Sequence, residues 1–167
     1  MNTIKYCPNC GKLIGWKIIE QKKRLYCNHC HLPFYDQLKV GAGGLIENEG
    51  KLLLIQRTRD PFINTWNLPA GYVEVDESPI QAIIREVFEE TSLKVETEKL
   101  VDVYFFSDDP RGNGILIIYK CKLIGGTPKE SLEGKNPTYF SPSDVPDNIA
   151  GGGHDQAVIT WRKGYKF

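Results

Sequence analysis

Apolar residues recur at helical spacing in the middle of the chain, within the stretch GYVEVDESPIQAIIREVFEETSL at residues 71–93. The recurring positions are Ile80, Ile83, Ile84 and Val87. Because they stand three and four residues apart, they share one face of a helix, and we expect that face to be buried. Ser78, Pro79 and Gln81 predict where the helix begins, since serine accepts from a first-turn amide, glutamine reciprocates and proline suits the first position.

The other apolar runs are short and are separated by turn-forming residues, which is typical of strands. The predicted strands are residues 40–46, 52–56, 100–106, 114–123 and 138–140, and a closing helix is predicted from Asp155 to Tyr165. Asn48, Glu49 and Gly50 predict a turn between the first two strands. Strands interrupted by a strong central helix and followed by a late helix predict an α/β fold of the mixed α+β kind, in which helices sandwich a mixed sheet.

The length of 167 residues suits one ordinary domain and a small module. The chain carries 21 basic and 21 acidic residues, and this balance argues against a nucleic acid or an anionic membrane as a partner. No apolar run is long enough to span a bilayer, and the start MNTIKYCPNC lacks the apolar core of a signal peptide. We therefore expect a cytoplasmic protein without a membrane partner.

Four of the five cysteines form two CxxC pairs separated by sixteen residues. They are Cys7, Cys10, Cys27 and Cys30. This spacing predicts a structural zinc ribbon over residues 1–36, with two short antiparallel strands held by the metal. A pair of disulfides is the competing interpretation, which the missing export signal disfavours. Cys121 lies in an apolar run and is interpreted as a packed small residue.

Three glutamates follow the apolar face of the central helix. Glu86, Glu89 and Glu90 occupy an arc of roughly 100° beside it, where like charges repel. Oxygen ligands gathered in this way suit Mg²⁺ or Mn²⁺. A solvated acidic face is the alternative interpretation, because glutamate is common on surface helices.

The residues around these glutamates closely resemble the signature box of the Nudix hydrolases. The matching charged and glycine positions are Gly71, Glu77, Arg85, Glu86, Glu89 and Glu90. Ser92 stands where the family usually has glycine, and a serine costs about 1 kcal/mol in the left-handed helix end that glycine favours. The resemblance implies a Nudix domain, an α/β/α sandwich with a mixed sheet, over residues 37–167 after the zinc ribbon.

The resemblance also implies roles for single residues. Glu86 and Glu90 become the principal ligands of a catalytic Mg²⁺ or Mn²⁺, with Glu89 as a further ligand. The backbone carbonyl of Ala70 completes the metal shell in some members of the family. The remaining charged box positions, Arg85 and Glu77, orient a ligand and do not touch substrate.

Further residues are candidates for contacts with the substrate. An arginine near position 57 often meets the substrate phosphates in Nudix proteins, so Arg57 is a candidate, with a surface ion pair as the alternative. Trp66, Tyr104 or Phe105 are candidates to stack on a base, with packing in the core as the alternative. In several members of the family a general base comes from a later loop, where Glu130 and Glu133 are the candidates; an ordinary exposed glutamate is the alternative for each.

Nudix substrates are nucleoside diphosphates linked to another group. Some zinc-ribbon Nudix proteins of this compact layout act on ADP-ribose and FAD, so the resemblance favours these two substrates, and Pro110 resembles a loosely spaced marker of ADP-ribose hydrolases. NADH ranks lower, because the marker sequence of NADH pyrophosphatases is absent. We therefore expect a pyrophosphohydrolase that releases a nucleoside monophosphate, and the resemblance also suggests a homodimer. The alternative is a non-catalytic module that senses a nucleotide and uses the ribbon to bind nucleic acid or protein.

Overall fold

The computed structural model describes residues 4–164 and divides the chain into two compact units, Met1–Gln37 and Leu38–Phe167. Residues 1–3 and 165–167 lie outside the described residues, and with them Tyr165, the predicted end of the closing helix. No helix within the described residues is long and apolar enough to cross a membrane.

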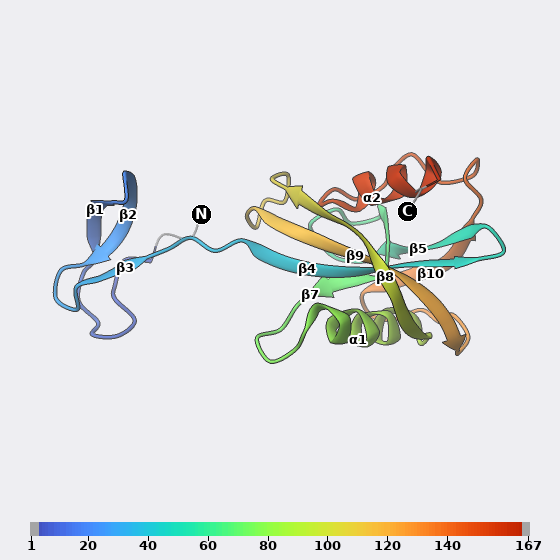
Figure 1. The fold of residues 1–167 in the computed structure, drawn as a ribbon, viewed down its shortest axis with the longest axis horizontal. Helices are drawn as coiled ribbons and strands as arrows, with labels where there is room; N and C mark the ends of the chain where they lie inside the picture. Colours follow the sequence, from blue (N-terminus) through green and yellow to red (C-terminus); the bar gives the residue numbers. More distant parts are fainter. Residues whose placement is uncertain (1–3, 165–167) are drawn as a thin grey trace. The chain divides into compact units, whose positions relative to one another are not determined.

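The first unit is a small three-stranded antiparallel sheet, drawn in blue in Figure 1. Its strands are β1 (Gly15–Ile19), β2 (Lys22–Cys27) and β3 (Leu32–Phe34). Two strands were predicted, and β3 is an addition that pairs with the second half of β2. Few side chains in this unit are buried, and two of those that are belong to Cys7 and Cys27.

The second unit is built on a seven-stranded mixed sheet. Its strands are β4 (Lys39–Asn48), β5 (Lys51–Arg57), β6 (Trp66–Asn67), β7 (Ala70–Tyr72), β8 (Lys94–Phe106), β9 (Gly114–Gly125) and β10 (Gly134–Phe140). The main path runs β10-β5-β4-β9-β8, with β6 on β5 and β7 on β4. The pair of β4 and β9 is parallel and the other pairs are antiparallel, so the prediction of a mixed sheet is confirmed.

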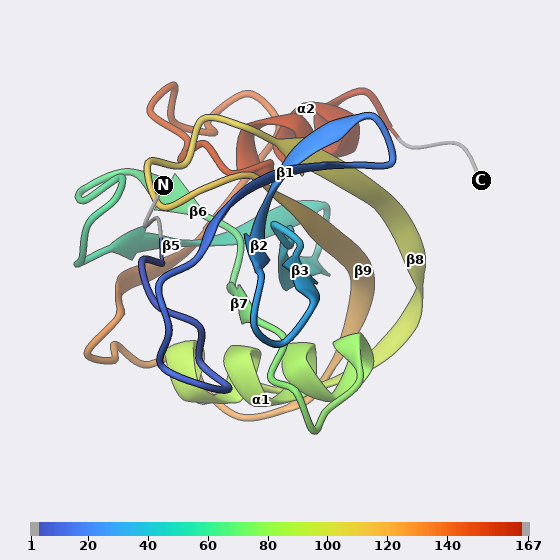
Figure 2. The same ribbon diagram turned by 90° about the vertical axis from the view of Figure 1, so that its left-hand side faces the viewer.

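Helices α1 (Pro79–Thr91) and α2 (His154–Arg162) lie on opposite sides of this sheet, as Figures 1 and 2 show. Alternate residues of the central strands point to opposite faces of the sheet and belong to two separate core layers. Ile46 and Leu53 pack with α1, whereas Leu45 and Leu54 pack with α2. Cys121 is buried in the layer of α1, as predicted for a packed residue. The α/β/α sandwich is therefore confirmed.

The start of α1 follows its sequence. The Ser78 side chain accepts from the amide of Gln81, the Gln81 side chain accepts from the amide of Ser78, and Pro79 occupies the first turn. The far end stops at Ser92, whose backbone adopts the left-handed conformation with φ 60°. Both ends of the helix are thus set by local chemistry.

The buried face of α1 is narrower than predicted. Ile83 and Val87 are fully buried, but Ile80 and Ile84 are each 42% exposed. The sheet covers the arc that holds Ile83 and Val87 and continues toward the glutamates, since Glu90 is buried as well. Two of the four expected core residues therefore lie on the flank of the helix.

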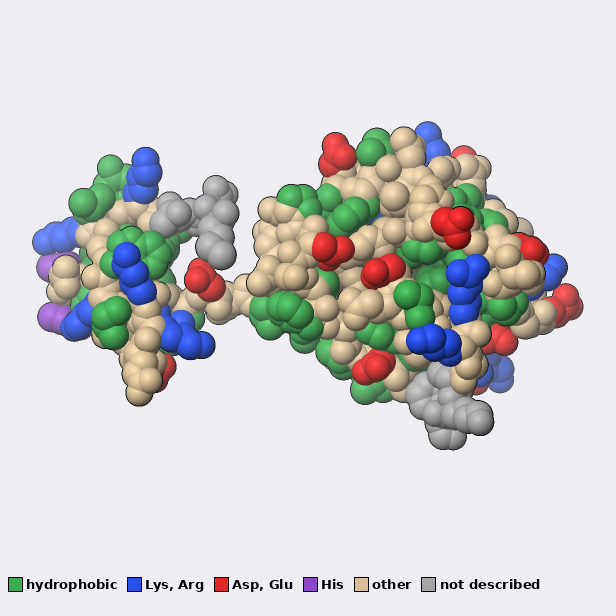
Figure 3. All heavy atoms as spheres, turned by 90° about the horizontal axis from the view of Figure 1, so that it is seen from above, with side chains coloured by type: hydrophobic (Ala, Val, Ile, Leu, Met, Phe, Trp, Pro, Cys, Tyr) green, Lys and Arg blue, Asp and Glu red, His purple; other side chains and the backbone are tan. Residues whose placement is uncertain are grey.

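The surface of the larger unit carries both signs of charge. On the face drawn in Figure 3, acidic and basic side chains are interspersed. This agrees with the overall balance of charge in the chain.

Candidate functional site

The box glutamates face the residues that lead into the helix, where β7 passes beside α1. A Cβ added to Gly71 would lie 2.1 Å from the Glu86 carboxylate, so only glycine leaves that carboxylate its place. Ala70 stands at the position where the family has another glycine. Its Cβ faces Gly43 of β4, where an added Cβ would come within 2.9 Å, so glycine at position 43 leaves room for alanine at position 70.

Arg85 connects the loop before the helix with two box carboxylates. Its Nε and Nη2 donate to Glu77 at 3.1 and 2.5 Å, and its Nη1 donates to Glu86 at 2.7 Å and to Glu89 at 3.2 Å. Nη2 also donates to the carbonyl of Tyr72 at 3.1 Å. Hydrogen bonds from Arg85 lower the pKa of Glu77, and the same bonds raise the pKa of the guanidinium. This geometry suits an orienting role for Arg85 and Glu77.

Glu90 is the buried carboxylate of the box. Glu90 is only 6% exposed, and its Oε2 accepts a hydrogen bond from the amide of Ala70 at 2.9 Å. Burial raises the pKa of Glu90 to about 8, although the Ala70 amide lowers it. Burial also raises the pKa of Glu86. Two desolvated carboxylates beside one cavity fit a divalent cation, which usually takes one or two carboxylates together with waters and substrate phosphates.

Glu89 does not join these two carboxylates. Its side chain is 57% exposed, pairs with Arg85 and does not line the cavity. Within residues 4–164, only the four cysteines form a group of three or more metal-ligating side chains whose ligand atoms lie within 4.8 Å of one another. The three predicted carboxylates are therefore not gathered, because Arg85 holds Glu89 at the surface while Glu90 turns toward the sheet.

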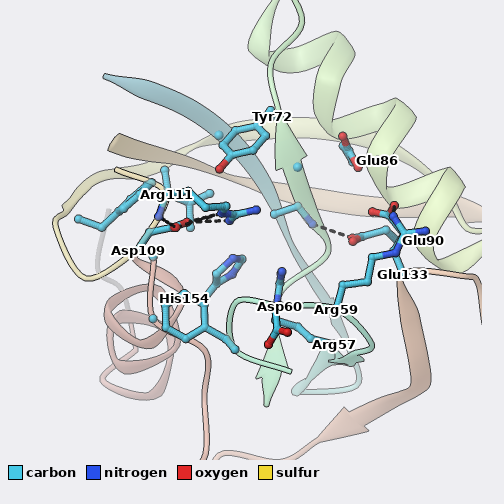
Figure 4. A pocket seen from close by; sticks show the side chains of 18 of the residues that line it. Arg57, Arg59, Asp60, Tyr72, Glu86, Glu90, Asp109, Arg111, Glu133 and His154 are labelled. Atoms are coloured by element: carbon cyan, nitrogen blue, oxygen red, sulfur yellow. Dashed lines mark hydrogen bonds and ion pairs between the residues drawn. The ribbon is translucent and has the colours of Figure 1, made fainter. Parts of the chain in front are cut away.

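A cavity of about 360 Å³ opens beside Glu86 and Glu90. Figure 4 shows it with Glu86, Glu90 and Glu133 on one side and Asp109, Arg111 and His154 on the other. Arg57 and Arg59 lie along its lower edge in that view. The cavity thus combines the carboxylates of the buried Glu90 and the partly buried Glu86 with arginines, and these two kinds of group suit a metal-bound polyphosphate.

Arg57 lies where the sequence predicted a contact with phosphate. Its Nε donates to the carbonyl of Pro61 at 3.0 Å, which fixes the side chain at the cavity. Burial lowers the pKa of its guanidinium, and the nearby Glu90 carboxylate opposes this effect. Arg59 also lines the cavity and pairs with Glu133. Of the two candidate bases, Glu133 lines the cavity, whereas the Glu130 carboxylate accepts from the amide of Asn136 at 3.1 Å.

The aromatic residues expected to stack on a base lie elsewhere. Trp66 does not line the cavity and packs edge to face on Phe140, with ring centroids 5.0 Å apart. Tyr104 is buried in the core layer of α2, and Phe105 is 55% exposed. Neither lines the cavity, whereas Phe106 and Tyr72 do. The one-residue shift from Phe105 to Phe106 places the next side chain on the opposite face of the strand.

Sequence reasoning missed several cavity residues, among them Asp109, Arg111 and His154. Asp109 and Arg111 come from the loop between β8 and β9, and His154 is the first residue of α2. The loop was interpreted only as a turn. A lone histidine directly after three glycines was the available signal for the third residue, because glycines permit a close approach of the backbone to a ligand.

The four cysteines of the first unit meet as their spacing predicted. Their Sγ atoms all lie within 4.8 Å of one another, with 3.9 Å between Cys7 and Cys30 and 3.7 Å between Cys10 and Cys27. A tetrahedral zinc with bonds of about 2.3 Å separates its sulfurs by about 3.8 Å. A disulfide needs about 2.05 Å, so the geometry fits zinc and does not fit disulfides.

Comparison with known proteins gives an independent result. The profile of the NUDIX domain matches residues 37–161, well over half of the chain. An ADP-ribose pyrophosphatase from Methanocaldococcus jannaschii is 36% identical over 141 residues, which are 81% of this chain and 78% of that protein. A crystal structure of a NUDIX hydrolase from Nitrosomonas europaea superimposes with a TM-score of 0.78 at 30% identity, covering 97% of this chain and 93% of that one.

More distant relatives include the NAD-capped RNA hydrolase NudC from Shigella flexneri. It is 35% identical over 97 residues, which are 58% of this chain and 37% of that protein. The matched region is therefore little more than a third of NudC.

Proposed function

The chain belongs to the Nudix hydrolase family, and on that basis we propose that it is a divalent-metal-dependent pyrophosphohydrolase that cleaves ADP-ribose to AMP and ribose 5-phosphate. The observation that carries the proposal is the cavity in which the buried Glu90 carboxylate and the partly buried Glu86 carboxylate face Arg57. The relative of which this chain covers 78% is named an ADP-ribose pyrophosphatase, which supports the choice of substrate. FAD is the next candidate and NADH follows.

The reaction adds one water across the phosphoanhydride. A bond forms between the water oxygen and one phosphorus, the bridging P–O bond breaks, and the bridging oxygen leaves with the other phosphate. One proton of the water must be removed, and negative charge grows on the leaving phosphate. A bound Mg²⁺ or Mn²⁺ supplies neutralisation of the phosphates and acidification of water.

The side chains of the cavity have three further roles, which are metal binding, diphosphate binding and orientation of a metal ligand. Glu86 and Glu90 hold the metal, with the Ala70 carbonyl as a further donor. Arg57 and Arg59 bind the diphosphate with charged hydrogen bonds. Arg85 and Glu77 act through Glu86 and orient it.

Glu133 is the proposed general base. Its carboxylate lines the cavity on the same side as Glu86 and Glu90, and its pairing with Arg59 places it beside the proposed diphosphate site. The four cysteines hold a structural Zn²⁺ that takes no part in the reaction.

Product analysis tests the proposal. The protein is incubated with ADP-ribose, FAD, NADH, diadenosine polyphosphates and nucleoside triphosphates, with Mg²⁺, with Mn²⁺ or with a chelator. We expect AMP and ribose 5-phosphate from ADP-ribose with either metal and no product with the chelator. If the folded protein binds ADP-ribose but cleaves none of the compounds with either metal, the non-catalytic alternative replaces this proposal.

A further inference from the structure

The glycine turn before α2 is fixed closely against its neighbours. A Cβ added to Gly151 would lie 1.9 Å from the Asp108 carboxylate, and the amide of Gly152 donates to the same carboxylate at 3.1 and 3.2 Å. At Gly153 the backbone has φ 91°, which favours glycine, and no side chain caps the helix there. The turn therefore sets the position of the next residue, His154, at the wall of the cavity.

His154 is buried without a partner. The residue is 8% exposed, its ring lines the cavity, and its Nδ1 finds no hydrogen-bond partner among the described residues. Figure 4 shows the ring pointing into the cavity, between Arg111 on one side and Asp60 on the other. A buried polar group that makes no hydrogen bond costs about 1–3 kcal/mol, so such groups are rare in folded proteins and point to a ligand or a function.

The imidazole is uncharged at neutral pH. Burial lowers the pKa of His154 to about 3, and the positive charge of Arg57 acts in the same direction. A neutral imidazole offers one N–H donor and one nitrogen acceptor. A neutral imidazole can therefore form hydrogen bonds with hydroxyl, amino or carbonyl groups, whereas a cationic side chain binds phosphate more strongly.

The surroundings of His154 suit an uncharged ring. Arg111 is engaged by Asp109, to which its Nε donates at 3.0 and 3.1 Å and its Nη2 at 2.6 Å. The guanidinium of Arg111 lies 5.4 Å from the centre of the Tyr72 ring. Phe106 adds a buried apolar surface to the wall. This side of the cavity thus offers the aromatic surface of Phe106 and Tyr72 and an arginine already paired with Asp109.

We propose that His154 determines specificity by hydrogen-bonding an uncharged ring at one end of the substrate, the nucleobase or the terminal sugar, and so favours a nucleoside diphosphate joined to a sugar over a nucleoside triphosphate. The inference rests on the proposed function, since it places the diphosphate near Arg57 and one flanking group beside His154. Figure 4 shows these two positions next to each other in one cavity.

Kinetics of two substitutions test the role of the ring nitrogens. His154→Phe keeps a flat ring and removes both nitrogens, and His154→Asn keeps a polar atom near the position of Nδ1. For ADP-ribose, we expect His154→Phe to raise KM about tenfold with little change in kcat, the loss typical of one hydrogen bond, and His154→Asn to restore most of the affinity. Tyr104→Phe is the matched control, because Tyr104 is buried beside Gly153 but does not line the cavity.

Thermal melting separates recognition from a structural role. Replacing an unpartnered buried polar group with an apolar ring of similar size should leave stability unchanged or raise it. The inference is overturned if His154→Phe leaves KM unchanged, or if kcat and the melting temperature fall together and His154→Asn restores neither.

Two further substrates identify the ring. Inosine diphosphate ribose changes the base, and ADP-glucose changes the sugar. If His154→Phe weakens the native preference between ADP-ribose and the inosine compound, the contact is with the base; if it weakens the preference between ADP-ribose and ADP-glucose, the contact is with the sugar. Unchanged preference for both overturns the inference.

Failure of the proposed function gives a different result. In that case the native protein cleaves none of the three compounds, and calorimetric titration with ADP-ribose still tests His154 directly. Weaker binding by His154→Phe than by Tyr104→Phe supports the inference, and equal binding overturns it.

Discussion

The two candidate metal sites of this protein are organised in opposite ways. In the small unit the four sulfurs already lie within 4.8 Å of one another, as zinc requires. In the Nudix unit the carboxylates are held apart by the protein, with Glu89 on Arg85 and Glu90 on the amide of Ala70. A closed structural site is completed by its protein ligands alone, whereas an open catalytic site depends on surrounding hydrogen bonds and is completed by waters and substrate.

Of the changes that distinguish the two sites, removal of zinc should have the largest effect, and this effect should be on the folding of the first unit. Zinc binding supplies about 10–16 kcal/mol in small zinc domains, and the first unit buries few side chains. We expect Cys27→Ser to abolish zinc binding and the hydrogen-exchange protection of β1 to β3, while hydrolysis of ADP-ribose continues. Metal analysis, hydrogen exchange and turnover are measured on the same sample. Loss of turnover together with zinc would show that the ribbon takes part in the active site.

The next largest effect should come from Glu90→Gln, which leaves shape and burial nearly unchanged. Removal of one charged element from a preorganised site costs on the order of 10²–10³-fold in turnover. The matched control is Glu89→Gln, which removes the same charge from the same helix at an exposed position. We expect a much smaller loss from the control. Equal losses in kcat would mean that Glu89 moves to the metal when substrate binds.

The pH dependence of stability should distinguish Glu90 without any substrate. Its pKa is raised from 4.5 to about 8, so between these values the metal-free folded protein binds more protons than the unfolded chain. The free energy of unfolding therefore falls as pH rises through this range. Glu90→Gln should flatten this dependence, and so should saturating Mg²⁺, which favours the ionised carboxyl. Urea denaturation at several pH values measures the slope, and identical slopes for native and variant would contradict the burial argument.

A smaller effect is expected from Glu77→Gln. Substitution of a residue that orients a metal ligand typically costs about 10–100-fold in metal affinity or activity. Because Glu77 reaches Glu86 only through Arg85, the loss should appear mainly as a higher Mg²⁺ concentration for half-maximal turnover. A metal titration of activity tests this, and an unchanged midpoint with lower kcat would place Glu77 in contact with the substrate.

Local chemistry explains which features the sequence could predict. The start of α1 follows from the neighbouring residues Ser78, Pro79 and Gln81, and the spacing of the cysteines sufficed to predict their cluster. The exposure of Ile80 could not be predicted in this way, because it depends on how much of the helix the sheet covers.

The missed cavity residues depend on contacts between distant parts of the chain. Arg111 precedes β9, which pairs with β4 in a parallel register across more than 70 residues of sequence, from Lys39 with Gly114 to Ile46 with Cys121. His154 reaches the same cavity from the last helix. No periodic pattern or local motif connects such positions, so their meeting is a property of the fold.

The smallest expected effect concerns the end of α1, two residues beyond Glu90. Ser92 has φ 60° and ψ 14°, and its amide donates to the carbonyl of Phe88 at 2.8 Å. Glycine adopts this conformation without the strain of a Cβ, so Ser92→Gly should raise the free energy of unfolding of the Nudix unit by up to about 1 kcal/mol. Ser92→Ala is the control, because it removes the hydroxyl and keeps the strain. If hydrogen bonds around Arg85 organise the open site, the gain in stability leaves kcat and KM unchanged; a change in kcat would show that the helix end also positions the glutamates.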